Sequence, residues 1–89
     1  MKNILIIGSG KSGVGACKLA VSKNYNVKLT DSKKISLQTK KILHSINVSF
    51  EEESHSESNL AWADTIIISP GVSDKILFVQ LAKKIGIPI

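Results

Sequence analysis

The sequence predicts an α/β domain built on an open, doubly wound parallel sheet of four to five strands, with helices on both faces. Two observations predict this fold class. Short apolar runs alternate with segments whose apolar residues recur at helical spacing, and such alternation requires parallel strands joined by right-handed crossovers. The length of 89 residues, with 43% apolar and 21% charged residues, suits one small domain with a single core.

The first strand and helix are expected on either side of a glycine-rich stretch. Residues 3–7, "NILII", form a short apolar run that ends on glycine, which is typical of a strand buried on both faces. Residues 11–23 predict a helix with Cys17 on its apolar side and Asn24 as its stop. The chain has one cysteine, which excludes an internal disulfide, and we expect Cys17 to be a packed thiol rather than a nucleophile.

The middle of the chain predicts two further strands and a weaker helix. Residues 26–30, "NVKLT", alternate in polarity and predict a strand that ends at Asp31. Residues 36–45 predict a helix, and residues 47–50, "NVSF", predict a brief third strand. The polar residues 51–59, "EEESHSESN", are expected to form an exposed loop, with a short turn of helix following.

The last third of the chain contains the clearest strand. Residues 65–69, "TIIIS", are β-branched and apolar. A final helix should follow, capped by Ser73 or Asp74, with an apolar stripe predicted to consist of Leu77, Leu81, Ala82 and Ile85. Residues 87–89, "IPI", predict the start of another strand, which suggests a piece of a longer protein.

The net charge of +5 comes from twelve lysines and no arginine. Nucleic-acid surfaces usually add arginine and interleaved aromatic residues, so a solvated lysine-rich surface is the better interpretation. No apolar run reaches the length of a membrane span, and no signal peptide is recognisable. We therefore expect a soluble, cytoplasmic monomer with no nucleic-acid or membrane partner. Any phosphate would be held by backbone N–H groups, hydroxyls and lysines.

The stretch "IIGSGKSGVG", residues 6–15, is compatible with two ligand classes. Its "GSGKS" resembles an ATPase phosphate loop, which requires G-x-x-x-x-G-K-[ST]. The position five residues before Gly10 is Leu5, inside the predicted strand, so the loop is too short to wrap a triphosphate. The ATPase interpretation fails.

The other pattern, G-x-G-x-x-G at Gly8, Gly10 and Gly13, fits its place between a strand and a helix. In Rossmann-like folds these glycines allow a tight turn, close approach to a phosphate and close packing of helix on sheet. The helix N-terminus then favours an anion, where Ser12 either adds a hydroxyl ligand or caps the helix. Asp31 stands where such folds place an acid for a ribose or base. The alternative is a ligand-free glycine turn with a capping aspartate.

A second loop, Ser69-Pro70-Gly71-Val72, follows the strand "TIIIS" at the same edge of the predicted sheet. A Pro-Gly turn at this position would expose backbone amides to the ligand crevice. The alternative is an ordinary turn into the last helix.

Taken together, "IIGSGKSGVGA", "LTDSK", "ADTIIISPGVS" and "AKKIGIPI" resemble the N-terminal domain of the Mur ligases that build bacterial peptidoglycan. "GSGKSG" combined with "SPGV" is more similar to the branch that adds D-glutamate than to the branch that adds L-alanine. The resemblance implies a site for the UDP part of UDP-N-acetylmuramoyl-L-alanine. From the residues alone, the NAD-binding domain of a dehydrogenase or regulatory protein stays the alternative.

The resemblance also implies roles for individual residues. The amides of Lys11 and Ser12, with the Ser12 hydroxyl, would hold the diphosphate, and Gly71 would contact the uracil. Lys33 stands where the family often has arginine. The bidentate hydrogen bond that an arginine guanidinium can form is therefore not expected at this position. The complete predicted UDP-binding set is Gly8, Gly10, Lys11, Ser12, Gly13, Asp31, Ser32, Lys33, Ser69, Pro70, Gly71 and Val72, and no catalytic or metal-binding residue is assigned.

In this family, ATP and magnesium bind a separate central domain, and a third domain recruits the amino acid. The resemblance therefore implies no cofactor in these 89 residues and no activity without the central and C-terminal domains, which would be its partners. A domain that binds nothing measurable on its own is a further possibility. His44 and His55 lack the spacing of a metal site.

Overall fold

The computed structural model describes residues 2–73 and 75–89. In the described chain, four strands form one all-parallel sheet in the order β3-β2-β1-β4. The strands are β1 (Asn3–Ile7), β2 (Asn26–Thr30), β3 (Ser49–Glu51) and β4 (Thr65–Ile68). The helices are α1 (Lys11–Ser22), α2 (Leu37–Ser45), α3 (Ser58–Trp62) and α4 (Leu77–Lys84). The predicted doubly wound α/β class is confirmed.

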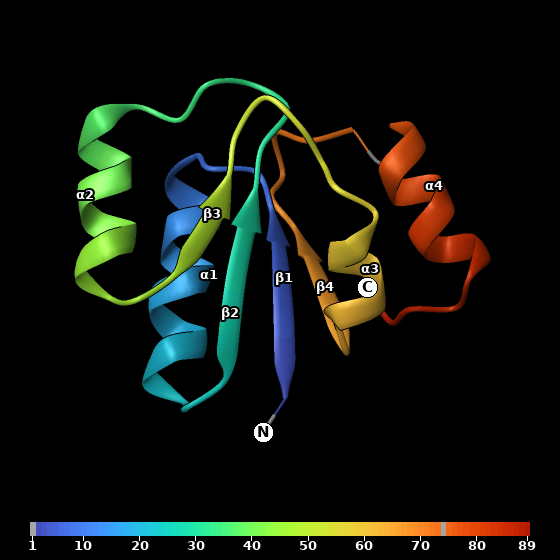
Figure 1. Ribbon diagram of the computed structural model, residues 1–89, viewed down its shortest axis with the longest axis horizontal. Coiled ribbons are helices and arrows are strands. Elements are labelled where there is room, and N and C mark those ends of the chain that lie inside the picture. The colour runs from blue at the N-terminus through green and yellow to red at the C-terminus, as the bar shows by residue number, and fades with distance from the viewer. Residues whose placement is uncertain (1, 74) are drawn as a thin grey trace.

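Helices cover both faces of the sheet, with α1 and α2 on one face and α3 and α4 on the other (Figure 1). The alternation of side chains along β1 explains this arrangement. Ile4 and Ile6 pack in the cluster that contains α1 and α2 residues, whereas Leu5 and Ile7 pack in the cluster that contains α3 and α4 residues. All four side chains are buried, as the unbroken apolar run predicts for a central strand.

The register of the sheet places the ends of three strands side by side. Ile7, the last residue of β1, pairs with Thr30 of β2 and with Ile68 of β4. The loops after these strands therefore begin at one edge of the sheet. This edge carries the glycine loop, the segment that begins at Asp31 and the segment that begins at Ser69 (Figure 1).

The third strand starts two residues later and ends one residue later than predicted. Asn47 has a positive φ of 59°, and its N–H group donates to the carbonyl of His44 at the end of α2. The N–H group of Val48 donates to Leu43 in the same way. Because these two N–H groups close the turn after the helix, the ladder with β2 starts only at Ser49.

The last helix differs from the prediction in its cap and its buried face. Ile76 is the N-cap residue, without a side-chain cap among the described residues, and the Ser73 hydroxyl accepts from the N–H of Lys75 in the preceding turn. Asp74 lies outside the described residues. The buried residues are Phe78, Val79 and Ala82, whereas Leu77 is 86% and Ile85 55% exposed. Leu81 and Ala82 lie on the buried face, as predicted. The other predicted residues do not, because the aromatic ring of Phe78 packs in the core with residues of β1 and β4 instead.

Residues 87–89 form no strand in the structure, contrary to the prediction. They nevertheless run beside the outer edge of β4, because the N–H group of Ile66 donates to the carbonyl of Pro88 at 2.9 Å. The segment therefore lies where a further strand would lie, joined to β4 by this hydrogen bond.

Candidate functional site

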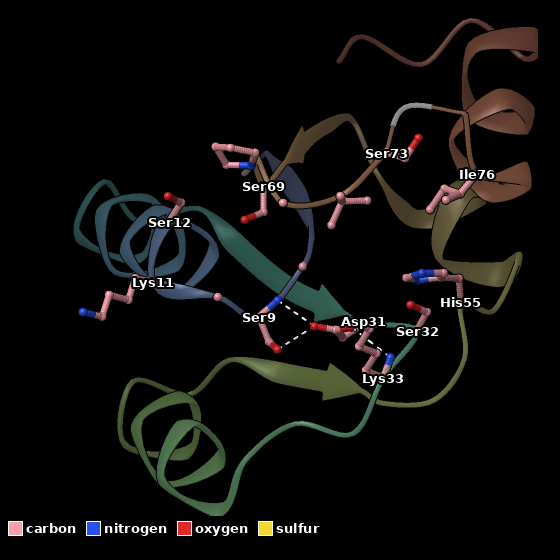
Figure 2. A pocket seen from close by; sticks show the side chains of 15 residues that line it. Ser9, Lys11, Ser12, Asp31, Ser32, Lys33, His55, Ser69, Ser73 and Ile76 are labelled. Carbon is pink, nitrogen blue, oxygen red and sulfur yellow. Dashed lines mark hydrogen bonds between the residues drawn. The ribbon is translucent and has the colours of Figure 1, made fainter.

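A pocket of about 410 Å³ lies at the edge of the sheet where β1, β2 and β4 end. We call residues 8–12 and 31–33 its first rim, and residues 69–73 with Ile76 its second rim; His55 completes the lining (Figure 2). Every residue of the predicted set except Gly13 lines this pocket. In open α/β sheets, this crevice beyond the strand ends is the usual position of the ligand.

Gly13 contributes by its position behind the first rim. A Cβ atom on Gly13 would lie 1.9 Å from the carbonyl oxygen of Gly8, much closer than atoms can approach. The absence of a side chain therefore allows α1 to begin directly against the turn that leaves β1, which is the packing role predicted for this glycine.

Gly8 is the point where the two rims meet. Its φ of +105° is a conformation that side-chain-bearing residues rarely adopt. A Cβ atom here would lie 2.7 Å from Cβ of Ser69 and 2.8 Å from Cγ2 of Val72. A glycine is therefore required both for the turn and for the contact between the rims.

The N-terminus of α1 opens into the first rim. Gly10 is the N-cap residue, and among the described residues no side chain caps the helix and no acid lies in its first turn. Helices leave their first N–H groups without internal partners, so these groups suit an anion. The alternative that Ser12 caps the helix is wrong. The Lys11 side chain is exposed and extends away from Asp31 and His55 in Figure 2.

Asp31 connects the two halves of the first rim. Its Oδ2 atom accepts hydrogen bonds from the Ser9 N–H (2.9 Å) and the Ser9 hydroxyl (2.6 Å), and its Oδ1 atom accepts one from the Lys33 N–H at 2.9 Å (Figure 2). Three of roughly four acceptor positions of the carboxylate are thus used within the protein. Sequence reasoning missed Ser9, whose partner lies 22 positions away.

These hydrogen bonds keep Asp31 ionised. Partial burial raises its pKa, but the hydrogen bonds from Ser9 and Lys33 and the nearby His55 more than offset that effect, so the pKa lies below the ordinary value of 3.8. At neutral pH the first rim therefore presents a carboxylate next to an uncapped helix N-terminus.

The second rim is a compact turn. The N–H of Ser69 donates to the carbonyl of Ile7, which continues the pairing of β4 with β1, and the N–H of Val72 donates to Ser69. Ser69 is buried, whereas Pro70 and Gly71 are exposed. Within the described chain, a Cβ atom on Gly71 would meet no atom within 4 Å. The tip of this turn is therefore open to a ligand.

His55 is, like Ser9, Ser73 and Ile76, a lining residue that sequence reasoning did not assign to the pocket. Its Nδ1 atom lies 2.9 Å from the Thr30 hydroxyl, and its ring stacks on Phe78, with 4.9 Å between ring centroids and 20° between planes. The predicted exposed loop 51–59 is thus partly buried, and Glu51 holds it by accepting from the N–H of Ser56 at 2.8 Å and from its hydroxyl. A lone histidine in a polar run contains no signal of this burial.

Three other findings concern the rest of the described chain. Burial raises the pKa of the Cys17 thiol to about 12, which agrees with a packed, unreactive cysteine. Across residues 2–73 and 75–89, no group of three or more His, Cys, Asp or Glu side chains is placed to hold a metal ion. No helix in that part of the chain is both long and apolar enough to cross a membrane.

The chain matches a protein family over almost its whole length. The family model described as "Mur ligase MurD-like, N-terminal domain" matches residues 2–89. The UDP-N-acetylmuramoylalanine–D-glutamate ligase of Christiangramia forsetii is 39% identical over 99% of this chain, and that of Porphyromonas gingivalis is 38% identical over 96%. The chain spans only about a fifth of the length of these relatives (20% and 19%).

Two solved structures share the fold. The UDP-N-acetylmuramate:L-alanyl-gamma-D-glutamyl-meso-diaminopimelate ligase from Neisseria meningitides aligns with 99% of this chain and 28% of its own, with a TM-score of 0.82 and 23% identity. SirC, a precorrin-2 dehydrogenase, aligns with 93% of this chain and 38% of its own, with a TM-score of 0.64 and 12% identity. At these identities the likeness concerns the fold alone.

Proposed function

The chain belongs to the family of Mur ligase MurD-like N-terminal domains, and on that basis we propose that its pocket binds the UDP part of UDP-N-acetylmuramoyl-L-alanine. One observation carries the proposal. The uncapped N-terminus of α1, the Asp31 segment and the open turn at Gly71 line a single pocket at the ends of β1, β2 and β4. This arrangement supports the proposal because it would combine an anion site with a polar site for a nucleoside.

The diphosphate would lie at the first turn of α1. The amides of Lys11 and Ser12 belong to that turn, and the Ser12 hydroxyl has no capping role that would compete with a ligand. Backbone N–H groups at a helix N-terminus bind phosphates well because the helix dipole adds to their hydrogen bonds. The positive charge of Lys11 would act at longer range, because its side chain extends away from Asp31 and His55 (Figure 2).

The uridine would lie between the Asp31 segment and the second rim. Asp31 has capacity for about one further hydrogen bond beyond the three it already accepts, which suits one ribose hydroxyl or one base N–H group. Ser32 and Lys33 are exposed beside it. The amide of Gly71 lies at the open tip of the opposite turn, where it would contact the uracil.

We further propose that the parent protein is a cytoplasmic, ATP-dependent ligase that adds D-glutamate in peptidoglycan synthesis. The relatives with that printed name are about five times longer than this chain, which covers 20% of the first of them. ATP, magnesium and the amino acid would be bound by parts of the protein outside these 89 residues. The domain alone would then bind the nucleotide without catalysing amide formation.

Calorimetric titration of the 89-residue domain with UDP-N-acetylmuramoyl-L-alanine, UDP and NAD tests the proposal. We expect the two uridine ligands to bind and NAD to bind more weakly or not at all. Tighter binding of NAD than of UDP would favour a dinucleotide domain of the dehydrogenase type. Absence of binding by all three would contradict a site that is complete within this domain.

A further inference from the structure

His55 forms the wall of the pocket at the end opposite the helix N-terminus. It belongs to the segment between β3 and α3, and its ring points into the space between Ser32 and Ile76, on the side away from Lys11 and Ser12 (Figure 2). If the diphosphate lies at α1, the group that reaches His55 is the nucleoside. The following inference therefore rests on the proposed function.

Two contacts hold the imidazole in one orientation. Thr30, the last residue of β2, is almost completely buried (1% exposed), and its hydroxyl lies 2.9 Å from Nδ1. Phe78 of α4 is also buried and stacks against one face of the ring. Because both partners belong to the core, the ring is fixed as rigidly as the sheet and the helix that hold it.

The imidazole is neutral at physiological pH. Burial lowers its pKa below the ordinary value of 6.5. The negative charges of Asp31 and Glu51 raise the pKa, but they offset the effect of burial only in part. A neutral imidazole has one donor nitrogen and one acceptor nitrogen. Since Nδ1 faces the Thr30 hydroxyl, Nε2 is the ring nitrogen that remains for a ligand.

We infer that His55 is a base-contacting residue of this pocket, which forms a hydrogen bond through Nε2 to the polar edge of the pyrimidine of a uridine diphosphate ligand. Uracil presents an N–H group between two carbonyl oxygens. Its edge therefore matches Nε2 whether that nitrogen donates or accepts. Removal of Nε2 would therefore leave one polar group of the base without a partner at this wall of the pocket.

Replacement of His55 by asparagine separates the two ring nitrogens. The asparagine amide can still reach the Thr30 hydroxyl in place of Nδ1, but no atom replaces Nε2. We expect His55→Asn to bind UDP about five- to tenfold more weakly than the wild type, as for loss of one hydrogen bond. Its affinity for inorganic pyrophosphate, which occupies only the helix N-terminus, should be unchanged. Calorimetric titrations with the two ligands measure this difference.

His55→Phe is the matched second variant, because it keeps a ring against Phe78 and removes both nitrogens. It should show the same selective loss of UDP affinity, and it decides the question if His55→Asn does not fold. Unchanged UDP affinity, or an equal loss for UDP and pyrophosphate, would overturn the inference and leave His55 a packing residue. Failure of the wild type to bind UDP would instead overturn the proposed function, and this inference with it.

Discussion

The two rims of the pocket are held in place by different interactions. In the first rim, the N–H and hydroxyl of Ser9 donate to the Asp31 side chain across two strand ends, and the Lys33 N–H donates to the same carboxylate from within the segment after β2. The second rim is held by hydrogen bonds within its own turn and by the pairing of Ser69 with Ile7. Among the described residues no side-chain hydrogen bond joins the rims, which instead meet by close packing at Gly8.

This difference indicates which kind of substitution should disturb each part of the pocket. The first rim depends on a carboxylate and its donors, so it should respond to changes of polarity and of pH. The junction between the rims depends on space, so it should respond to an added methyl group. The predictions below test that distinction, in order of decreasing effect.

The largest effect is expected from Gly13→Ala. The added Cβ atom would meet the Gly8 carbonyl oxygen at 1.9 Å, and backbone has to move to relieve the clash. We expect the free energy of unfolding to fall by about 3 kcal/mol or more, as measured by urea denaturation. Gly15→Ala is the control in the same helix: no atom of the described chain lies within 4 Å of its Cβ position, so it should stabilise by about 0.5–1 kcal/mol.

Gly8→Ala should have the next largest effect, at the junction itself. The positive φ and the contacts of 2.7 and 2.8 Å to Ser69 and Val72 would force the second rim away from the first. We expect a loss of about 2 kcal/mol in unfolding free energy together with weaker UDP binding. Gly71→Ala, in the open turn of the second rim, should change stability by less than about 0.5 kcal/mol. Equal effects of the two substitutions would refute the importance of packing at the junction.

Asp31→Ala should break the first rim while sparing the second. Loss of an acceptor for a buried ligand hydrogen bond should weaken UDP binding by about 1–3 kcal/mol, measured by calorimetry. An unchanged affinity would argue against a role of Asp31 in the site.

The same substitution should change how stability depends on pH. Because the folded pKa of Asp31 lies below its ordinary value of 3.8, its stabilising contribution is fully present above that value. The contribution is lost as the pH falls through the folded pKa. The difference in unfolding free energy between wild type and variant should therefore be largest near neutral pH and should shrink in acid. A difference that grew in acid would contradict the ionised role of Asp31.

Ser12→Ala should have the smallest effect and the most selective one. Because Gly10 is the N-cap and Ser12 caps nothing, stability should change by less than about 0.5 kcal/mol. UDP affinity should fall by about 1 kcal/mol if the hydroxyl contacts the diphosphate. A large loss of stability, seen in thermal unfolding, would restore a structural role for this hydroxyl.

Much of the fold and of the pocket could be predicted because the relevant signals are local. The apolar run 3–7 and the glycines that follow it fold as predicted, and the predicted strand 65–69 forms with its end one residue earlier, at Ile68. Parallel pairing then brings the ends of β1, β2 and β4 to one edge, so the glycine loop, the Asp31 segment and Ser69–Val72 had to lie together. The predicted α4 stripe was right for Leu81 and Ala82 and wrong for Leu77 and Ile85, because Phe78 packs into a core that its own turn of sequence does not reveal. The predicted Ser73 cap was wrong because the helix begins only after Ile76.

The sequence by itself determined the order of the elements, the parallel sheet and the edge at which a ligand would bind, because periodicity and glycine spacing act within a few residues. Only the tertiary structure decided that Ser9 donates to Asp31 and that His55 lies between Thr30 and Phe78. These contacts join residues 22 to 25 positions apart or on different elements. The physical reason is that burial and hydrogen-bond partners depend on which segments the sheet places side by side, and no short stretch of sequence contains that information.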